Sequence, residues 1–82
     1  MTIQEQGTSY KSGKSISCKE NAIIVFIGNF NSYTPTNMDL LANVLVNMSS
    51  SYVRCFAYKA TSETCSLTYT VHGGNVGYMV FF

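Results

Sequence analysis

The longest unbroken apolar run in the chain, residues 22–27, is bounded by Asn21 and Gly28. A strand that exposes one face alternates apolar and polar residues, so an unbroken run predicts a central strand covered on both faces. Six residues are too few for a typical helix, which favours a strand. We therefore expect the domain to be organised around one strand within residues 22–30.

Residues 37–48 follow a different period. Apolar residues recur at intervals of three and four, which is typical of one face of a helix. They are Met38, Leu41, Leu45 and Met48. Thr36 is a suitable N-cap, and Asp39 would place its charge in the first turn, where a helix favours it. The polar residues on the opposite face of this predicted helix are Asp39, Asn43 and Asn47.

Three further segments read as strands. Residues 52–60 alternate bulky and smaller side chains, which is the period of a strand. Residues 66–72 and 76–82 flank Gly73-Gly74 and predict a hairpin, because glycine supplies the positive φ that tight hairpin turns need. In that register the even positions of the first strand are polar and its odd positions apolar.

The whole pattern predicts an α+β fold in the order β-β-α-β-β-β. One helix would pack on one face of an antiparallel sheet of four or five strands. Residues 1–14 are rich in Ser, Gly and Lys and predict a mobile tail, which leads into an edge strand near residues 15–19. Residues 15–82 would then form a single domain.

One helix can cover only one face of such a sheet. The apolar residues expected on the other face are Val53, Cys55, Ala57, Met79 and Phe81. An exposed apolar patch of this kind usually marks an interface. We therefore expect a partner protein or a homodimer, with the outward polar stripe of the predicted helix as a second candidate surface.

The composition strengthens the expectation of association. Charged residues make up 11% of the chain and the formal net charge is +1, whereas an average soluble protein has ~25% charged residues. Such a surface is weakly self-repelling, and it has no basic field to attract nucleic acid. The chain shows neither a secretory signal nor an apolar run of the ~20 residues that span a membrane, which predicts a cytoplasmic protein without a membrane segment.

The supply of reactive groups is small, so we expect no enzyme, cofactor or metal site. Cys18, Cys55 and Cys65 have spacings that fit neither a disulfide framework nor a short metal-binding pair, and we expect reduced thiols. A secreted form with one disulfide is the alternative. His72 is the only histidine, and a partner thiol for it would have to be Cys55. Residues 13–15 resemble the end of a phosphate-binding loop but lack its correctly spaced glycine.

Two segments suggest a different class of partner. Residues 25–30 resemble the shorter signature of RNA-recognition motifs, and residues 77–82 resemble the longer one. The resemblance implies that single-stranded RNA or DNA stacks on Phe26 and Tyr78. Val76 stands where the longer signature has a basic residue, and the second helix of that family has no counterpart here. Nucleic-acid binding is therefore the alternative to the function that we expect, a small non-enzymatic protein-binding module such as an inhibitor, adaptor or immunity protein.

Overall fold

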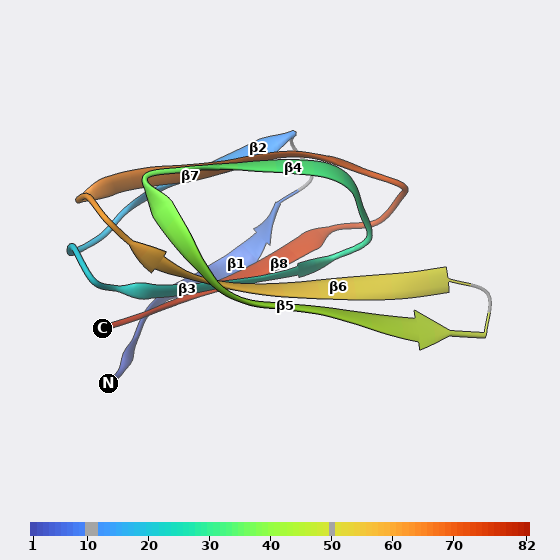
Figure 1. Cartoon of the computed structure of the whole chain (residues 1–82), viewed down its shortest axis with the longest axis horizontal. Helices are drawn as coiled ribbons and strands as arrows, with labels where there is room; N and C mark the ends of the chain where they lie inside the picture. The colour runs from blue at the N-terminus through green and yellow to red at the C-terminus, as the bar shows by residue number, and fades with distance from the viewer. Residues whose placement is uncertain (10–11, 50) are drawn as a thin grey trace.

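Two antiparallel sheets face each other in the structure, a computed structural model that describes residues 1–9, 12–49 and 51–82. The larger sheet has the strand order β1-β8-β3-β6-β5 and the smaller one the order β2-β7-β4. The two sheets form separate layers, and the ends of β5 and β6 extend beyond the other strands (Figure 1). The strands are β1 (Ile3–Ser9), β2 (Gly13–Ser17), β3 (Ile23–Gly28), β4 (Phe30–Thr36), β5 (Met38–Met48), β6 (Ser51–Ala60), β7 (Thr64–Val71) and β8 (Val76–Phe81).

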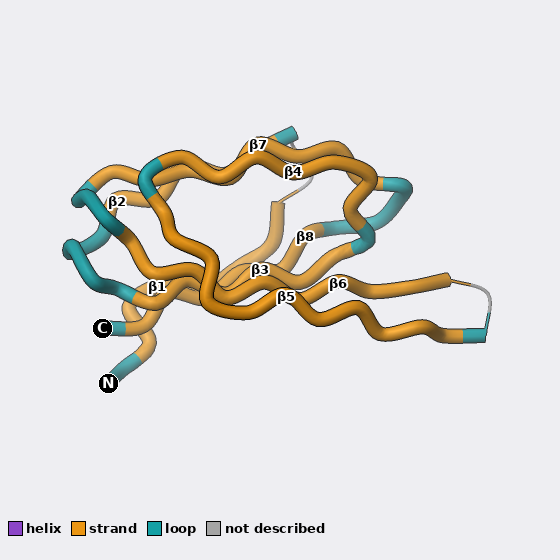
Figure 2. Tube along the Cα trace, in the orientation of Figure 1, coloured by secondary structure: helices purple, strands orange, loops and turns teal. Residues whose placement is uncertain are grey.

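The predicted helix over residues 37–48 is wrong, and with it the α+β class. Residues 38–48 form β5, which pairs with β6, and the described residues contain no helix (Figure 2). A bulge between Leu40 and Ala42 inserts one residue and changes which positions share a face. Apolar residues lie on both faces of this bulged strand, so their spacings of three and four in the sequence resemble the period of a helix.

Strands β1 and β2 occupy most of the segment for which the sequence suggested a mobile tail. β1 pairs with β8, and β2 pairs with β7. Residues 10 and 11 of that segment lie outside the described residues. The edge strand expected near residues 15–19 corresponds to β2, which begins two residues earlier and ends at Ser17.

The predicted hairpin of residues 66–82 is also wrong. β7 pairs with β2 and β4 in the small sheet, whereas β8 pairs with β1 and β3 in the large one. The connection at Gly73-Gly74 therefore carries the chain from one sheet to the other, and Gly74 has a φ of 78°. The apolar sides of the two strands still meet, but across the core. The buried residues that they contribute are Cys65, Leu67, Tyr69, Val76, Tyr78 and Val80.

β3 is the middle strand of the large sheet, but only one of its faces is covered. Ile24 and Phe26 point toward the small sheet and are fully buried. Val25 is half-buried and Ile27 is 46% exposed. The second covering layer predicted from the unbroken apolar run is not supplied by any described part of the chain.

Aromatic rings join the two layers. Phe30 of β4 has its ring centroid 5.3 Å from that of Phe56 in β6 and 5.4 Å from that of Tyr69 in β7. Tyr33 of β4 lies 4.4 Å from Phe56 by the same measure. Such pairs add ~0.5–1.5 kcal/mol each to the stabilisation that comes from burial. The core is therefore continuous from β6 through β4 to β7.

Two of the connections between the sheets consist of a single asparagine. Asn29 lies between β3 and β4, and Asn37 lies between β4 and β5 with a φ of 58°. The Asn37 side chain donates a hydrogen bond to the carbonyl of Thr64 at 3.0 Å, and the Asn37 carbonyl accepts one from the amide of Thr61 at 2.9 Å. Asparagine tolerates this left-handed conformation better than most residues. Thr36 is thus the last residue of a strand and not the expected N-cap, and Pro35 lies in the edge strand β4.

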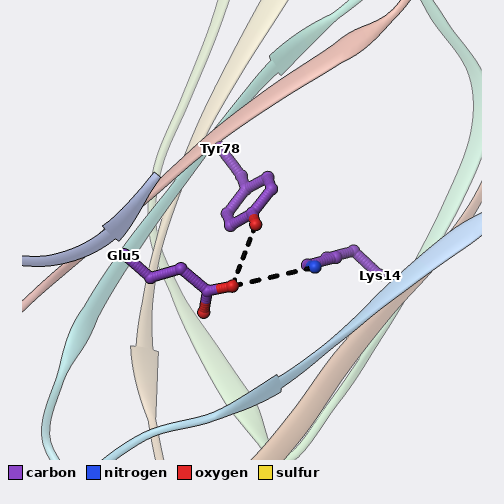
Figure 3. Close-up of polar contacts among 3 residues, drawn as sticks. All are labelled: Glu5, Lys14 and Tyr78. Carbon is purple, nitrogen blue, oxygen red and sulfur yellow. Dashed lines mark hydrogen bonds and ion pairs between the residues drawn. The ribbon is translucent and has the colours of Figure 1, made fainter. Parts of the chain in front are cut away.

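A polar cluster links the edges of the two sheets (Figure 3). The hydroxyl of Tyr78 in β8 donates to Oε1 of Glu5 in β1 at 2.9 Å, and Nζ of Lys14 in β2 lies 3.8 Å from the same oxygen. Lys14 also lies over the Tyr78 ring, 4.6 Å from its centroid. The contact with Tyr78 is the main cause that raises the pKa of Lys14 above its usual value. Both charged residues therefore point inward at the edges of their sheets.

Candidate functional site

The outer face of the small sheet is uniformly polar. Every side chain that β2, β7 and β4 direct away from the core within their paired registers belongs to serine or threonine. They are Ser15, Ser17, Ser32, Thr34, Thr36, Thr64, Ser66, Thr68 and Thr70. Ser32 and Thr70 lie opposite each other with their hydroxyl oxygens 2.8 Å apart. This face, which we call the hydroxyl face, has the composition of a surface in contact with water.

The outer face of the large sheet is apolar over its three middle strands except at Lys59, near the end of β6, and we call the apolar part the apolar face. It is formed by Ile23, Val25 and Ile27 of β3, Val53, Cys55 and Ala57 of β6, and Gly77, Met79 and Phe81 of β8. Val25 lies between Ala57 on one side and Met79 on the other. Ile27 lies between Cys55 and Gly77 in the same way. The structure therefore brings the five apolar residues singled out in the sequence, Val53, Cys55, Ala57, Met79 and Phe81, to one face.

The three polar residues singled out on the predicted helix do not form one stripe. Asp39 lies opposite Lys59, on the side of the apolar face. Asn43 and Asn47 lie opposite Phe56 and Tyr52, on the other side of β5, because the bulge at Leu41 separates them from Asp39. The predicted helical recognition face is therefore wrong.

A hollow lies at the side of the apolar face that borders β1. It has a volume of about 350 Å³ and is lined by Gln6, Gly7, Thr8, Val25, Ile27, Gly77, Tyr78 and Met79. Gly77 leaves this space open, since a Cβ atom there would meet only the carbonyl oxygen of Ile27, at 3.9 Å. The hollow is large enough to receive a bulky side chain of another molecule.

The apolar face continues onto the paired segments 42–48 of β5 and 51–57 of β6, which we call the arm. The tip of the arm passes beyond the end of β3, because the pairing of β3 with β6 stops at Arg54. Val44, Val46 and Met48 lie on the outer side of the arm and are 52%, 52% and 59% exposed. On the inner side, Nη1 of Arg54 donates a hydrogen bond of 2.7 Å to Oδ1 of Asn43.

Several members of this surface were not identified from the sequence. Val25 and Ile27 were assigned to a doubly covered strand, and Val44 and Val46 to a helix. Both faces of β3 are apolar, so Ile23–Gly28 shows no alternation of polar and apolar residues that could have revealed the open face. The five residues expected on one face belong to β6 and β8, which flank β3, and in both strands the two faces differ in size or polarity.

The cysteines and His72 do not form a catalytic group. Sγ of Cys18 and Sγ of Cys65 are 3.7 Å apart at one side of the core. Burial, followed by the contact with Cys18, raises the pKa of Cys65 to about 12, so its thiol is a poor nucleophile near neutral pH. His72 lies in the β7–β8 connection, and Cys55 lies on the apolar face. Within the described residues no three His, Cys, Asp or Glu side chains come together as metal ligands.

The two rings that an RNA-recognition motif would use for stacking lie inside the molecule. Phe26 is fully buried between the sheets and Tyr78 is 8% exposed. Neither ring presents a face to a base, and stacking on single-stranded nucleic acid needs such an exposed ring. The resemblance of these strands to the RNA-binding signatures therefore reflects the apolar residues of a sheet interior.

No helix long and apolar enough to cross a membrane occurs in residues 1–9, 12–49 and 51–82. Comparison with known proteins leaves the surface geometry as the guide to function, since no protein-family model, no curated protein and no solved structure matches this chain.

Proposed function

We propose that the protein acts by binding another protein through the apolar face, as a small inhibitor, adaptor or immunity-type module without catalytic activity of its own. The observation that carries this proposal is the difference between the two outer faces. Removing apolar surface from water contributes ~25 cal/mol per Å² to binding, so a partner that covers the apolar face gains free energy that the hydroxyl face does not offer. Contiguous apolar surface of this kind marks interaction sites.

The chemistry of the face defines the partner. Val25, Ile27 and Met79 line the hollow on the side of β3 and β8 and carry no charge or hydrogen-bonding side-chain group, whereas Gln6 and Thr8 of β1 line its other side. A matching partner presents an uncharged apolar surface with one bulky side chain that enters the hollow beside Gly77. Such a buried anchor is the usual centre of binding energy in protein interfaces. The cytoplasmic setting that the sequence predicts is part of the same proposal.

The test compares one lysine on each outer face. Ile27→Lys places a charge at the rim of the hollow, where a partner would have to desolvate it. Thr68→Lys places the same charge in the middle of the hydroxyl face, on an exposed residue of β7. The two tagged variants and the unmodified protein are used to capture proteins from a lysate of the source organism, with quantification by mass spectrometry.

We expect a protein that is captured by the unmodified chain and by Thr68→Lys, and reduced at least ~10-fold with Ile27→Lys. Both variants should keep the melting temperature of the unmodified chain within a few degrees, since both positions are exposed. A partner retained by Ile27→Lys and lost with Thr68→Lys would transfer the site to the hydroxyl face and overturn the proposal.

A further inference from the structure

The four edge strands of the two sheets are not protected equally. β1 and β2 carry the inward-pointing charges Glu5 and Lys14, and β4 contains Pro35. Charged residues, prolines and bulges are the devices by which proteins prevent the pairing of exposed edges. In β5 the charge of Asp39 and the bulge at Leu41 both lie at the end nearest the body. The remaining seven residues of β5, 42–48, have no charge, no proline and no bulge.

We propose that this bare edge pairs with the same edge of a second copy, antiparallel, about a two-fold axis at Leu45. This inference concerns the edge of the large sheet and does not depend on the apolar face as a docking site. A two-fold strand pair requires a segment that is complementary to its own reverse. Residues 42–48 read Ala-Asn-Val-Leu-Val-Asn-Met, which is close to a palindrome about Leu45.

The palindrome determines the register. With the axis at Leu45, Val44 of one copy lies opposite Val46 of the other, and Ala42 lies opposite Met48, all on the side of the apolar face. On the inner side Asn43 lies opposite Asn47 of the second copy. Oδ1 of Asn43 already accepts from Arg54, which leaves its Nδ2 to donate to Oδ1 of the facing Asn47. In this register each apolar residue lies opposite an apolar residue, and each asparagine lies opposite an asparagine.

Neighbouring registers lack this match. A shift of the axis to Val44 or to Val46 places an asparagine against Leu45 of the second copy. The first of these registers also runs into the bulge at Leu41, where the ladder is irregular. A shift by half a residue would put inner and outer side chains opposite each other, which a continuous sheet does not allow. Only the register with its axis at Leu45 therefore gives all seven residues a facing residue of the same chemical class.

The dimer formed in this way has a continuous sheet in which β5 meets β5 of the second copy. Its apolar face extends across the two-fold axis through Val44, Val46 and Met48 of both copies. One strand pair is a small interface, and small interfaces are weak, so we expect a dissociation constant of ~1–100 µM.

The test exploits the pair Val44–Val46, which only the proposed register forms. Val44→Lys or Val46→Glu alone places a charge against valine at two sites in the dimer, and each should raise the dissociation constant at least ~10-fold. The double variant Val44→Lys/Val46→Glu creates two lysine–glutamate pairs across the axis, and its dissociation constant should return to within ~3-fold of the original. Sedimentation equilibrium from 1 to 500 µM measures all four proteins.

Leu40→Lys is the matched control, because Leu40 is an exposed apolar residue of the same strand outside the paired segment. It should dimerise like the unmodified chain. A chain that stays monomeric at 500 µM overturns the inference, and so does a double variant no better than its two single variants. The protein-binding proposal is judged separately, by Ile27→Lys, whose position on β3 is two strands away from the edge.

Discussion

The two outer faces of this molecule enclose one core and belong to one short chain, yet they have opposite chemistry. The outward side chains in the paired registers of β2, β7 and β4, which form the hydroxyl face, all belong to serine or threonine. The apolar face presents mainly apolar side chains on β3, β6 and β8. If contact with water alone had shaped the surface, both faces would be polar. This difference is the basis of the proposal that the apolar face binds another protein.

The largest effect that tests this contrast lies within one strand. Phe26 and Ile27 are neighbours in β3, one inside the core and one on the apolar face. Phe26→Ala should lower the free energy of unfolding by ~3–5 kcal/mol, because it leaves a cavity among buried rings. Ile27→Ala should cost less than ~1 kcal/mol, because nearly half of the side chain is already exposed. Urea unfolding measures both values. Equal losses would mean that Ile27 is covered and that the apolar face is part of a core.

Thiol chemistry provides the next contrast, between Cys55 on the apolar face and Cys65 in the core. At pH 8 a maleimide should label Cys55 at least ~100-fold faster than Cys65, because Cys65 is buried and its pKa is raised to about 12. Peptide mapping over time gives the two rates. Similar rates would contradict the assignment of Cys65 to the interior.

The same pKa predicts a dependence of stability on pH. The folded state holds the Cys65 proton more tightly than the unfolded state, where the ordinary value is 9.0. Its contribution to stability is therefore complete below about pH 9 and is lost as the pH rises toward 12. Cys65→Ala should remove this part of the alkaline destabilisation. A parallel loss of stability in both proteins between pH 9 and pH 11 would show that other groups, such as the buried Tyr58, account for it.

A hydrophobic dye can compare the two faces directly. The double variant Val25→Thr/Ile27→Thr makes the middle of the apolar face resemble the hydroxyl face. It should reduce the fluorescence of bound anilinonaphthalene sulfonate several-fold, because less apolar surface is exposed. Thr68→Val/Thr70→Val makes the reverse change on β7 and should increase the fluorescence. No change in either variant would mean that the dye, and by inference a partner, does not use these faces.

The smallest effect concerns the hollow. Gly77→Val should alter the free energy of unfolding by no more than ~1 kcal/mol, because a Cβ atom at this position meets no close neighbour and valine suits a strand. The same change should weaken capture of the partner, since the side chain fills the space beside Ile27. A thermal melt and the capture experiment measure the two effects. A large loss of stability would show that the hollow is needed for the fold itself.

Sequence patterns predicted which residues share a face of a strand better than they predicted which strands pair with each other. Alternation separated the apolar odd positions of residues 66–72 from the polar even ones correctly, and Leu67 and Tyr69 are buried, because a period of two reports which residues share a face. It could not report that β7 and β8 belong to different sheets, since strands that face each other across a core and strands that pair within a sheet show the same pattern. Gly73-Gly74 suits either connection.

The arm could not be predicted for a different reason. A buried face normally imposes a period, and from Asp39 onward β5 has no buried face. Its residues are apolar on both sides, and the bulge at Leu41 removes the remaining alternation. Because residues 39–48 are exposed, their sequence does not show the alternation that identifies a strand. The same residues form the exposed edge of the large sheet. The members of the apolar face on β6 and β8 were found because their opposite faces, with Phe56 or Val80, contribute to the core.

The strand order has a consequence for the time course of folding. Among the strands that the structure describes, only β5 and β6 pair with a neighbour in sequence, whereas β1 pairs with β8. Local pairs form in microseconds, and pairs between distant segments form late because a long loop must close first. We therefore expect the pairing of β5 with β6 to form early when the chain refolds, and the pairing of β1 with β8 to form late.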